Sequence, residues 1–169
     1  MAQDRFVVRS EEAEEGATRF SHPWNPHSEL YGTRLSSLVR LSRVGVSRVR
    51  VPPGKESFAY YSHYREEEWI YVLSGHGVAE IGDEEYEVGA GDFVGFAAPQ
   101  VAHHLRNPYE EDLVYLVGGE VLDVDVADFP RLGKRMVRRG QDVEIYDVSD
   151  AKEFGPLGGK PREGVTPCV

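Results

Sequence analysis

The sequence predicts an all-β domain, a sandwich or barrel of short strands. Between residues 34 and 119, short apolar stretches recur about every 8 to 12 residues and are separated by glycine, proline or aspartate. This spacing is typical of such folds. The chain has 169 residues, which is enough for one domain with a sizeable core. Its 18 glycines and 10 prolines fit a chain with many turns.

The strand prediction depends on a series of apolar stretches within that region. Two turns between them are well marked: Gly82-Asp83 precedes one stretch, and Gly89-Ala90-Gly91 precedes the next. The predicted strands therefore lie within residues 35–41, 46–51, 57–64, 68–74, 78–82, 85–89, 92–96, 101–107 and 112–118.

Composition shifts along the chain divide the predicted domain into parts, with no internal repeat and no second domain. The parts are an N-terminal arm at 1–33, a barrel at 34–120, a C-terminal extension packing on the barrel at 121–155 and a frayed tail at 156–169.

The two flanking parts carry expectations of their own. The arm is polar and rich in glutamate, which predicts an irregular segment that Phe20 and Trp24 anchor to the body. The extension is predicted to form a short helix after Pro130 and one more strand within 142–150.

Charge and cysteine content limit the class of protein. The chain has 19 lysines and arginines against 29 aspartates and glutamates, a net charge of −10. This balance argues against a nucleic-acid or anionic-membrane partner, since both recruit basic surfaces. No apolar run reaches the length of a membrane span, and the first residues lack the apolar stretch of a signal peptide. With Cys168 as the single cysteine, no intrachain disulfide can form, and a cytoplasmic protein is expected.

Strand alternation places several polar side chains on inward faces. Glu68 shares a face with Ile70, and His103 shares one with Leu105, because every second residue of a strand points the same way. Tyr61 and His63 likewise share a face, so all four polar residues are predicted to point into one barrel. His104, one residue further on, is predicted to face away, at the surface or an interface.

Two histidines and one carboxylate on inward faces suit a divalent metal. Imidazole binds Fe, Ni, Zn and Cu, a carboxylate extends the range to Mn, and a two-His, one-carboxylate set leaves open positions for a substrate or dioxygen. The alternative is that each histidine is a hydrogen-bonded polar residue near a strand end. Glu66 and Glu67, beside Glu68, are alternative ligands or a solvated turn, and the turn is favoured.

Two motifs resemble those of the cupin superfamily, whose fold is a double-stranded β-helix of jelly-roll type. The first cupin motif has glycine, H-x-H, glutamate and glycine at set distances, and the second has glycine, P-x-G, histidine and asparagine. The matching positions in this chain are Gly54, Tyr61-Ser62-His63, Glu68, Gly75, Gly91, Pro99, His103 and Asn107. The resemblance covers residues 34 to 120 and is closest to small single-domain bacterial cupins.

The resemblance implies a metal site formed by His63, Glu68 and His103. Tyr61 stands where the family has its first histidine. A phenol must lose a proton to bind a metal, and its ordinary pKa of about 10 makes this cost roughly 4 kcal/mol near neutral pH unless the metal lowers that pKa. Tyr61 is therefore a conditional fourth ligand. Ala97 and Pro99 also depart from the second motif, so the loop geometry there is less defined by the resemblance than the strands.

Further residues are assigned by pattern. Arg48 and Arg50 alternate with valines and are candidates for a pocket mouth, but an outward, salt-bridged face is favoured. Tyr71 and Phe93 are predicted as pocket aromatics, with a core or interface position as the alternative. Residues with predicted structural roles are Gly75, Gly91 and Asn107.

Three functions remain open. The first is a metal-dependent enzyme acting on a small molecule, of the dioxygenase, isomerase or cyclase type. The second is a non-catalytic module for a sugar or carboxylate, with a degenerate metal site. The third is a metal-free isomerase or epimerase, in which His103 or His63 is the base and Tyr61 the acid. A homodimer is expected from the resemblance, and the arm aromatics Phe20, Trp24 and Tyr31 support it, because they need a surface to cover.

Overall fold

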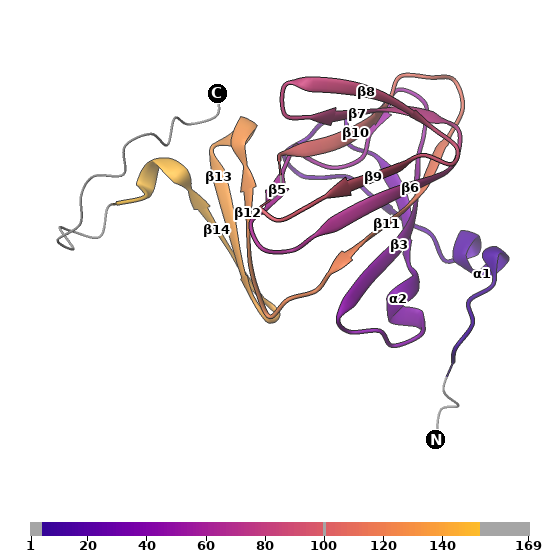
Figure 1. The fold of residues 1–169 in the computed structure, drawn as a ribbon, viewed down its shortest axis with the longest axis horizontal. Helices are drawn as coiled ribbons and strands as arrows, with labels where there is room; N and C mark the ends of the chain where they lie inside the picture. The colour runs from indigo at the N-terminus through magenta and orange to yellow at the C-terminus, as the bar shows by residue number, and fades with distance from the viewer. Residues whose placement is uncertain (1–4, 100, 153–169) are drawn as a thin grey trace.

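A computed structural model describes residues 5–99 and 101–152. The predicted tail at 156–169, with Cys168, lies outside the described residues. The described chain consists mostly of antiparallel strands, so the all-β prediction is confirmed (Figure 1). None of the helices in this part of the chain has the length and apolar character needed to cross a membrane.

Sheet A forms one wall of the barrel. Its strands, in spatial order, are β1 (Thr18–Phe20), β2 (Leu30–Arg34), β3 (Val44–Val51), β11 (Leu113–Glu120), β6 (Glu68–Ser74) and β9 (Phe93–Phe96). Strand β6 shows the expected alternation, whereas β11 begins with three consecutive buried residues. In β6, Ile70 and Val72 are buried while Tyr71 and Leu73 are exposed.

Sheet B forms the opposite wall. It contains β4 (Lys55–Glu56), β10 (His103–Asn107), β7 (His76–Ile81) and β8 (Glu84–Gly89) in spatial order. Strands β7 and β8 form a hairpin with Gly82-Asp83 as its two-residue loop, as predicted. Gly82 has a φ of +60°, which glycine adopts without the steric cost that a Cβ brings.

Sheet C covers one end of the two walls. It contains β14 (Asp142–Asp147), β13 (Lys134–Arg139), β12 (Val124–Phe129) and β5 (Ser62–His63) in spatial order. Figure 1 shows β12, β13 and β14, in orange to yellow, beside the barrel. Only β5 belongs to the predicted barrel segment, so the C-terminal extension is joined to the barrel through the pairing of β5 with β12.

The core lies between sheets A and B. Apolar side chains from β3, β6, β9 and β11 meet apolar side chains from β7, β8 and β10. Burying this much apolar surface is the main force that holds two sheets face to face. Most of the predicted strands are confirmed by this arrangement, those within 46–51, 68–74, 78–82, 85–89, 92–96, 101–107 and 112–118.

Two predicted strands were wrong in whole or in part. Residues 35–41 begin with a helical turn, α2 (Leu35–Leu38), whose two leucines are three residues apart, a helical spacing. Within 57–64, only Ser62–His63 forms a strand, because the chain crosses there from β4 of sheet B to β5 of sheet C. Tyr61 makes an isolated bridge to His103 on the way.

The two flanking segments also differ from expectation. The arm is not irregular throughout, since it contains the short helix α1 (Ser10–Glu15) and two strands that extend the edge of sheet A. An open edge presents unpaired backbone groups, and β2 satisfies those of β3. The helix expected after Pro130 is only the single turn η1 (Pro130–Leu132).

The residues after η1 form β13, because they pair on both sides with β12 and β14. Gly133 and Gly140, at the two ends of β13, both have positive φ and interrupt any helix. The predicted strand within 142–150 is confirmed as β14, which is followed by the turn η2 (Val148–Asp150).

Gly75 joins β6 to β7 under tight packing, which yields a stability prediction. Its φ is +76°, and a Cβ there would lie 2.1 Å from the carbonyl oxygen of Asp112. We expect Gly75→Ala to lower the free energy of unfolding by about 4 kcal/mol, in the range of severe backbone strain. Urea denaturation of the purified variant measures this loss.

Gly54 provides the matched control, since its φ is +69° and a Cβ there would meet nothing within 4 Å. Gly54→Ala should cost only about 1 kcal/mol, the penalty of the left-handed backbone region. Equal losses in the two variants would contradict the packing argument.

Candidate functional site

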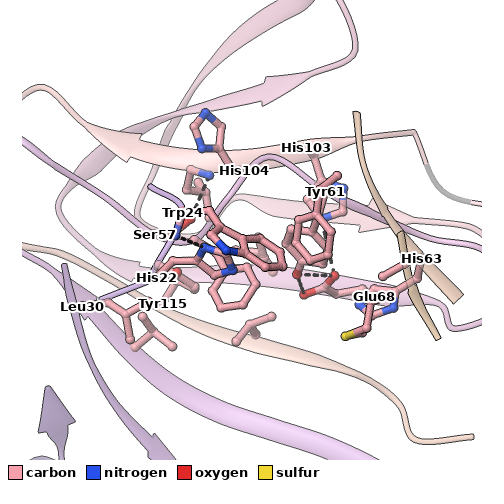
Figure 2. Close-up of a pocket in the computed structure, with 18 of the residues that line it drawn as sticks. His22, Trp24, Leu30, Ser57, Tyr61, His63, Glu68, His103, His104 and Tyr115 are labelled. Carbon is pink, nitrogen blue, oxygen red and sulfur yellow. Dashed lines mark hydrogen bonds and ion pairs between the residues drawn. The ribbon is translucent and has the colours of Figure 1, made fainter. Parts of the chain in front are cut away.

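A cavity of about 360 Å³ lies where sheets A, B and C meet. Its walls are mainly aromatic and aliphatic, and they come from all three sheets and from the N-terminal arm. Tyr61, His63, Glu68 and His103 all line it, so the structure brings together the four side chains that alternation predicted to share one barrel interior (Figure 2).

Tyr61 and Glu68 are directly bonded in this cavity. The Tyr61 hydroxyl lies 3.0 and 2.9 Å from the two carboxylate oxygens of Glu68. Burial, reinforced by the negative charge of Glu68, raises the pKa of Tyr61 well above its ordinary value. The side chain is therefore a protonated phenol that donates a hydrogen bond, and the phenolate needed for metal ligation is disfavoured.

His103 presents a nitrogen to the same carboxylate. Its Nδ1 lies 2.9 Å from the carbonyl oxygen of Val101, and since a carbonyl only accepts, Nδ1 carries a proton. Its Nε2 is buried and makes no hydrogen bond within the described residues, with Glu68 Oε2 3.4 Å away. The imidazole stacks on Phe96 with ring centroids 3.5 Å apart, which holds its orientation.

His63 is held by a carboxylate that the sequence analysis missed. Its Nδ1 lies 2.5 Å from Oδ2 of Asp125, which is fully buried. The other carboxylate oxygen of Asp125 accepts a hydrogen bond from the backbone N–H of Arg65. A carboxylate on Nδ1 orients an imidazole and directs its Nε2 to chemistry. Asp125 could have been found, because it shares the inward face of β12 with Ala127.

Glu66 was predicted to lie in a solvated turn, and this is wrong. Glu66 is buried, pairs with Arg138 and accepts a hydrogen bond from the backbone N–H of Leu122. Strand β13 brings Arg138 across this turn, so the carboxylate is removed from water together with an opposite charge. Glu67, next to it, is exposed as expected.

The predicted metal ligands do not converge in this structure. Within the described residues, the His, Cys, Asp and Glu ligand atoms that all lie within 4.8 Å of one another belong to His63, Glu66 and Asp125. Bonds of about 2.0–2.2 Å place two ligand atoms of one metal at most about 4.4 Å apart. His63, Glu68 and His103 therefore do not enclose a metal as they stand, although His103 and Glu68 face each other.

The His63, Glu66 and Asp125 group is a hydrogen-bonded network. The oxygens of Asp125 are bonded to His63 and to a backbone N–H, and Glu66 is paired with Arg138. A metal among them would have to displace these contacts. The network is better described as the support that orients His63.

The N-terminal arm closes the cavity on one side, which the sequence did not indicate. His22 and Trp24 line the cavity, and Figure 2 shows them beside each other. The His22 ring packs edge to face on Phe58 with ring centroids 4.3 Å apart, and Trp24 packs edge to face on Phe129 with ring centroids 5.4 Å apart. The arm is thus anchored as predicted.

The packing of the arm weakens one argument for a dimer. Phe20 stacks on Phe58 with ring centroids 5.6 Å apart, and Trp24 packs on Phe129 within the same chain. Tyr31 lies under the guanidinium of Arg50. These arm aromatics therefore contact side chains of their own chain, although Phe20 remains 41% exposed.

The four candidate pocket residues lie elsewhere. Arg48 and Arg50 line a separate surface hollow and pair with Glu14 and Asp112, as their outward position on β3 implies. Tyr71 and Phe93 do not line the cavity.

Both of these aromatics lie on the outer face of sheet A, exposed to 40% and 65%. The ring of Phe93 stacks on Trp69 there. Strand alternation showed which of these side chains share a face, but it did not show on which side of the sheet the cavity lies.

His104 was predicted to face away from the barrel interior, at the surface or an interface, but it is buried within this chain and lines the cavity. It is 6% exposed, its Nε2 lies 3.0 Å from Glu80, and its ring meets Tyr60 edge to face. The chain before β5 covers this face of sheet B. Asn107, by contrast, has the structural role predicted. It is buried, and its side-chain amide donates to the carbonyls of Val51 and Glu111.

The buried Asp125 should stabilise the fold as well as orient His63. We expect Asp125→Ala to lower the free energy of unfolding by about 3 kcal/mol, because it removes the fully buried carboxylate that is bonded to His63 and to the backbone N–H of Arg65. Asp128 lies on the same strand as Asp125 and makes an exposed ion pair with Arg135 of β13. Asp128→Ala, which removes this pair, should cost less than about 1 kcal/mol. Thermal or urea unfolding of both variants measures the difference, and similar losses would contradict it.

Comparisons with known proteins agree with this architecture. A family profile described as a cupin domain matches residues 47–119. A solved structure from Acidithiobacillus ferrooxidans, which carries the provisional name sugar phosphate isomerase, is 34% identical. The match covers 88% of this chain and 96% of that chain, with a TM-score of 0.83. No curated protein matches the chain.

More distant structures share the fold. A sugar phosphate isomerase of the cupin superfamily from Silicibacter pomeroyi is 19% identical, over 84% of this chain and 95% of that chain, with a TM-score of 0.73. A predicted oxalate decarboxylase from Thermotoga maritima is 24% identical, over 69% and 100%, with a TM-score of 0.58. With the motifs, the barrel and the long match at 34% identity in agreement, the chain belongs to the cupin superfamily.

Proposed function

We propose that the protein is an isomerase-type enzyme that moves a proton on a small molecule bound in the barrel cavity. The observation that carries this proposal is the buried contact of the Tyr61 hydroxyl with Glu68, beside the Nε2 of His103. A protonated phenol and an imidazole nitrogen with a lone pair are an acid and a base in one water-poor site. In such a pair, the base can take a proton from the carbon next to a carbonyl group while the acid protonates the carbonyl oxygen.

The reaction follows from the atoms at hand. His103 Nε2 removes a proton from the carbon next to a substrate carbonyl, and the C–H electron pair forms the enol double bond. The carbonyl oxygen takes the proton that Tyr61 donates as its O–H turns from Glu68 to the substrate. His103 then returns its proton to carbon, and the enol oxygen returns its proton to Tyr61, which restores both groups. Return to the original carbon gives proton exchange, and return to a carbon conjugated with the enol moves the double bond and gives an isomer.

The surroundings support these roles. The carbonyl of Val101 keeps the proton of His103 on Nδ1, so Nε2 has the lone pair. Burial and the charge of Glu68 raise the pKa of Tyr61, so the phenol is protonated before the substrate binds. His63, oriented by Asp125, is a second imidazole in the same cavity and can hold a substrate hydroxyl. The isomerase name of the Acidithiobacillus relative belongs to the same reaction class.

Proton exchange tests the proposal directly. In deuterium oxide, with a chelator present, the protein should exchange the α-protons of an unphosphorylated ketone such as β-tetralone or dihydroxyacetone faster than buffer, as followed by proton NMR. Tyr61→Phe and His103→Ala should each slow the exchange by about a hundredfold, the usual contribution of one acid or base.

Two exposed positions control for general effects. Tyr71→Phe and His76→Ala alter side chains of the same types outside the cavity and should leave the exchange unchanged. A native protein that binds these ketones without exchanging their protons would contradict the enzyme proposal and favour a binding module.

A metal-dependent enzyme is the second candidate, of the dioxygenase, isomerase or cyclase type. His63, Glu68 and His103 would hold the ion, which could be Fe, Mn, Ni, Zn or Cu, and a bound ion would supply Lewis-acid or dioxygen chemistry. The observation in its favour is the buried His103 Nε2, which makes no hydrogen bond within the described residues. Against it, the hydroxyl of Tyr61 lies within hydrogen-bond distance of both carboxylate oxygens of Glu68.

Elemental analysis after incubation with Fe, Mn, Ni and Zn separates the two candidates. We expect the native protein to retain well under one metal per chain and Tyr61→His to retain about one, because a neutral imidazole binds without the protonation cost of a phenol. Tyr60→His is the matched control, since Tyr60 bonds to the Gly82 carbonyl outside this site. One metal per native chain, lost in both His63→Ala and His103→Ala, would instead establish the metal enzyme.

A further inference from the structure

The charges around the cavity limit what it can bind. Among the described residues, no lysine or arginine lines it, and Glu68 is its one carboxylate. His63, His103 and His104 also line the cavity, and each faces a carboxylate, so a positive charge on any of these rings would be neutralised by its own neighbour. Burial lowers the pKa of His22, which keeps this ring neutral near neutral pH.

A phosphate group would therefore enter without compensation. A phosphate monoester carries nearly two negative charges near neutral pH, and removing them from water is costly unless opposite charges meet them. In this cavity the phosphate would meet the carboxylate of Glu68 and apolar walls.

The neighbouring hollow offers no better site. A second depression of about 360 Å³ shares His63 and Glu68 with the cavity. Among its described residues, four glutamates stand against two arginines, and Arg138 is already paired with Glu66. The net charge there is negative, so a phosphate is disfavoured on that side too.

The walls fit an uncharged and largely apolar body. Trp24, Phe58 and Phe129 form an aromatic end, and aliphatic side chains of sheets A and C complete the surface. Aromatic and aliphatic walls with a few polar groups are the usual lining of a small-molecule site. The polar groups are concentrated at Tyr61, His63 and His103, which is where a carbonyl or hydroxyl group can be held.

We propose that this cavity selects an uncharged small molecule with an aromatic or aliphatic ring body and one carbonyl or hydroxyl group, and that it excludes sugar phosphates. The inference concerns the substrate class and rests on the proposed isomerase-type function. It separates this chain from the substrate in the name of its Acidithiobacillus relative, while keeping the reaction class.

Calorimetric titration of the full chain tests the selection. The probes are β-tetralone, an uncharged bicyclic ketone, and dihydroxyacetone phosphate, a triose phosphate, with inorganic phosphate as a third. We expect β-tetralone to bind at one site per chain, and both phosphates to bind at least about tenfold more weakly. Phe58→Ala should weaken β-tetralone binding by about tenfold through lost aromatic contact.

A variant that adds a positive charge keeps the test independent of folding. Ile145 lines the cavity yet is 42% exposed, so Ile145→Lys should fold and should add a cation at the cavity edge. This variant should gain dihydroxyacetone phosphate binding. Val143→Lys is the matched control, because Val143 lies on the same strand outside the cavity lining and is 54% exposed.

The outcomes are distinct from those of the proposed function. Native protein that binds dihydroxyacetone phosphate as tightly as β-tetralone, or that binds no β-tetralone while folded, overturns the substrate class. If that phosphate binds and its α-protons exchange, the isomerase proposal survives and the substrate class fails. If β-tetralone binds without proton exchange, the substrate class survives and the isomerase proposal fails.

Discussion

The pairing of β5 with β12 is the constraint on which the site depends. Ala127 lies opposite His63 in this short ladder, so Asp125 and Phe129, on the same inward face of β12, reach the barrel interior. Asp125 then fixes the ring of His63, while Phe129 completes the aromatic end of the cavity. Without this pairing, sheet C would not close the end of the barrel, and His63 would lie at an open mouth.

The same closure explains why the chemistry of this cavity differs from that of an open metal site. Removing water raises the pKa of Tyr61 and strengthens its contact with Glu68, since hydrogen bonds to a charged group gain in a low-dielectric interior. The carboxylate of Glu68 is then bonded to the phenol of Tyr61, and the imidazole of His63 is bonded to the carboxylate of Asp125. In the proposed function, the tyrosine at the position of a family histidine gives its neighbours acid–base roles in place of metal ligation.

Local pattern predicted much of the barrel because strands carry their own signal. Alternation along β6 and β10 placed Glu68 and His103 on inward faces, and the structure buries Ile70 and Leu105 beside them. The Gly82-Asp83 hairpin was likewise evident, because a two-residue loop needs a glycine of positive φ. These features depend on residues within a few positions of each other, so a single sequence contains them.

Long-range contacts decided what the sequence could not. Asp125 and Glu66 became buried only because sheet C folds back over residues 62–68, and their partners lie about 60 or 70 positions away in sequence. Arg48, Tyr71 and Phe93 share strands with inward residues, yet the cavity formed on the other face of those strands.

The sequence by itself therefore determined most of the barrel strands and the motif residues. The tertiary structure decided which faces enclose the cavity, which charges are buried in pairs and that the N-terminal arm closes the cavity with His22 and Trp24. The physical reason is that burial and ion pairing depend on distant segments meeting in space, whereas alternation and turn formation depend on neighbours in the chain.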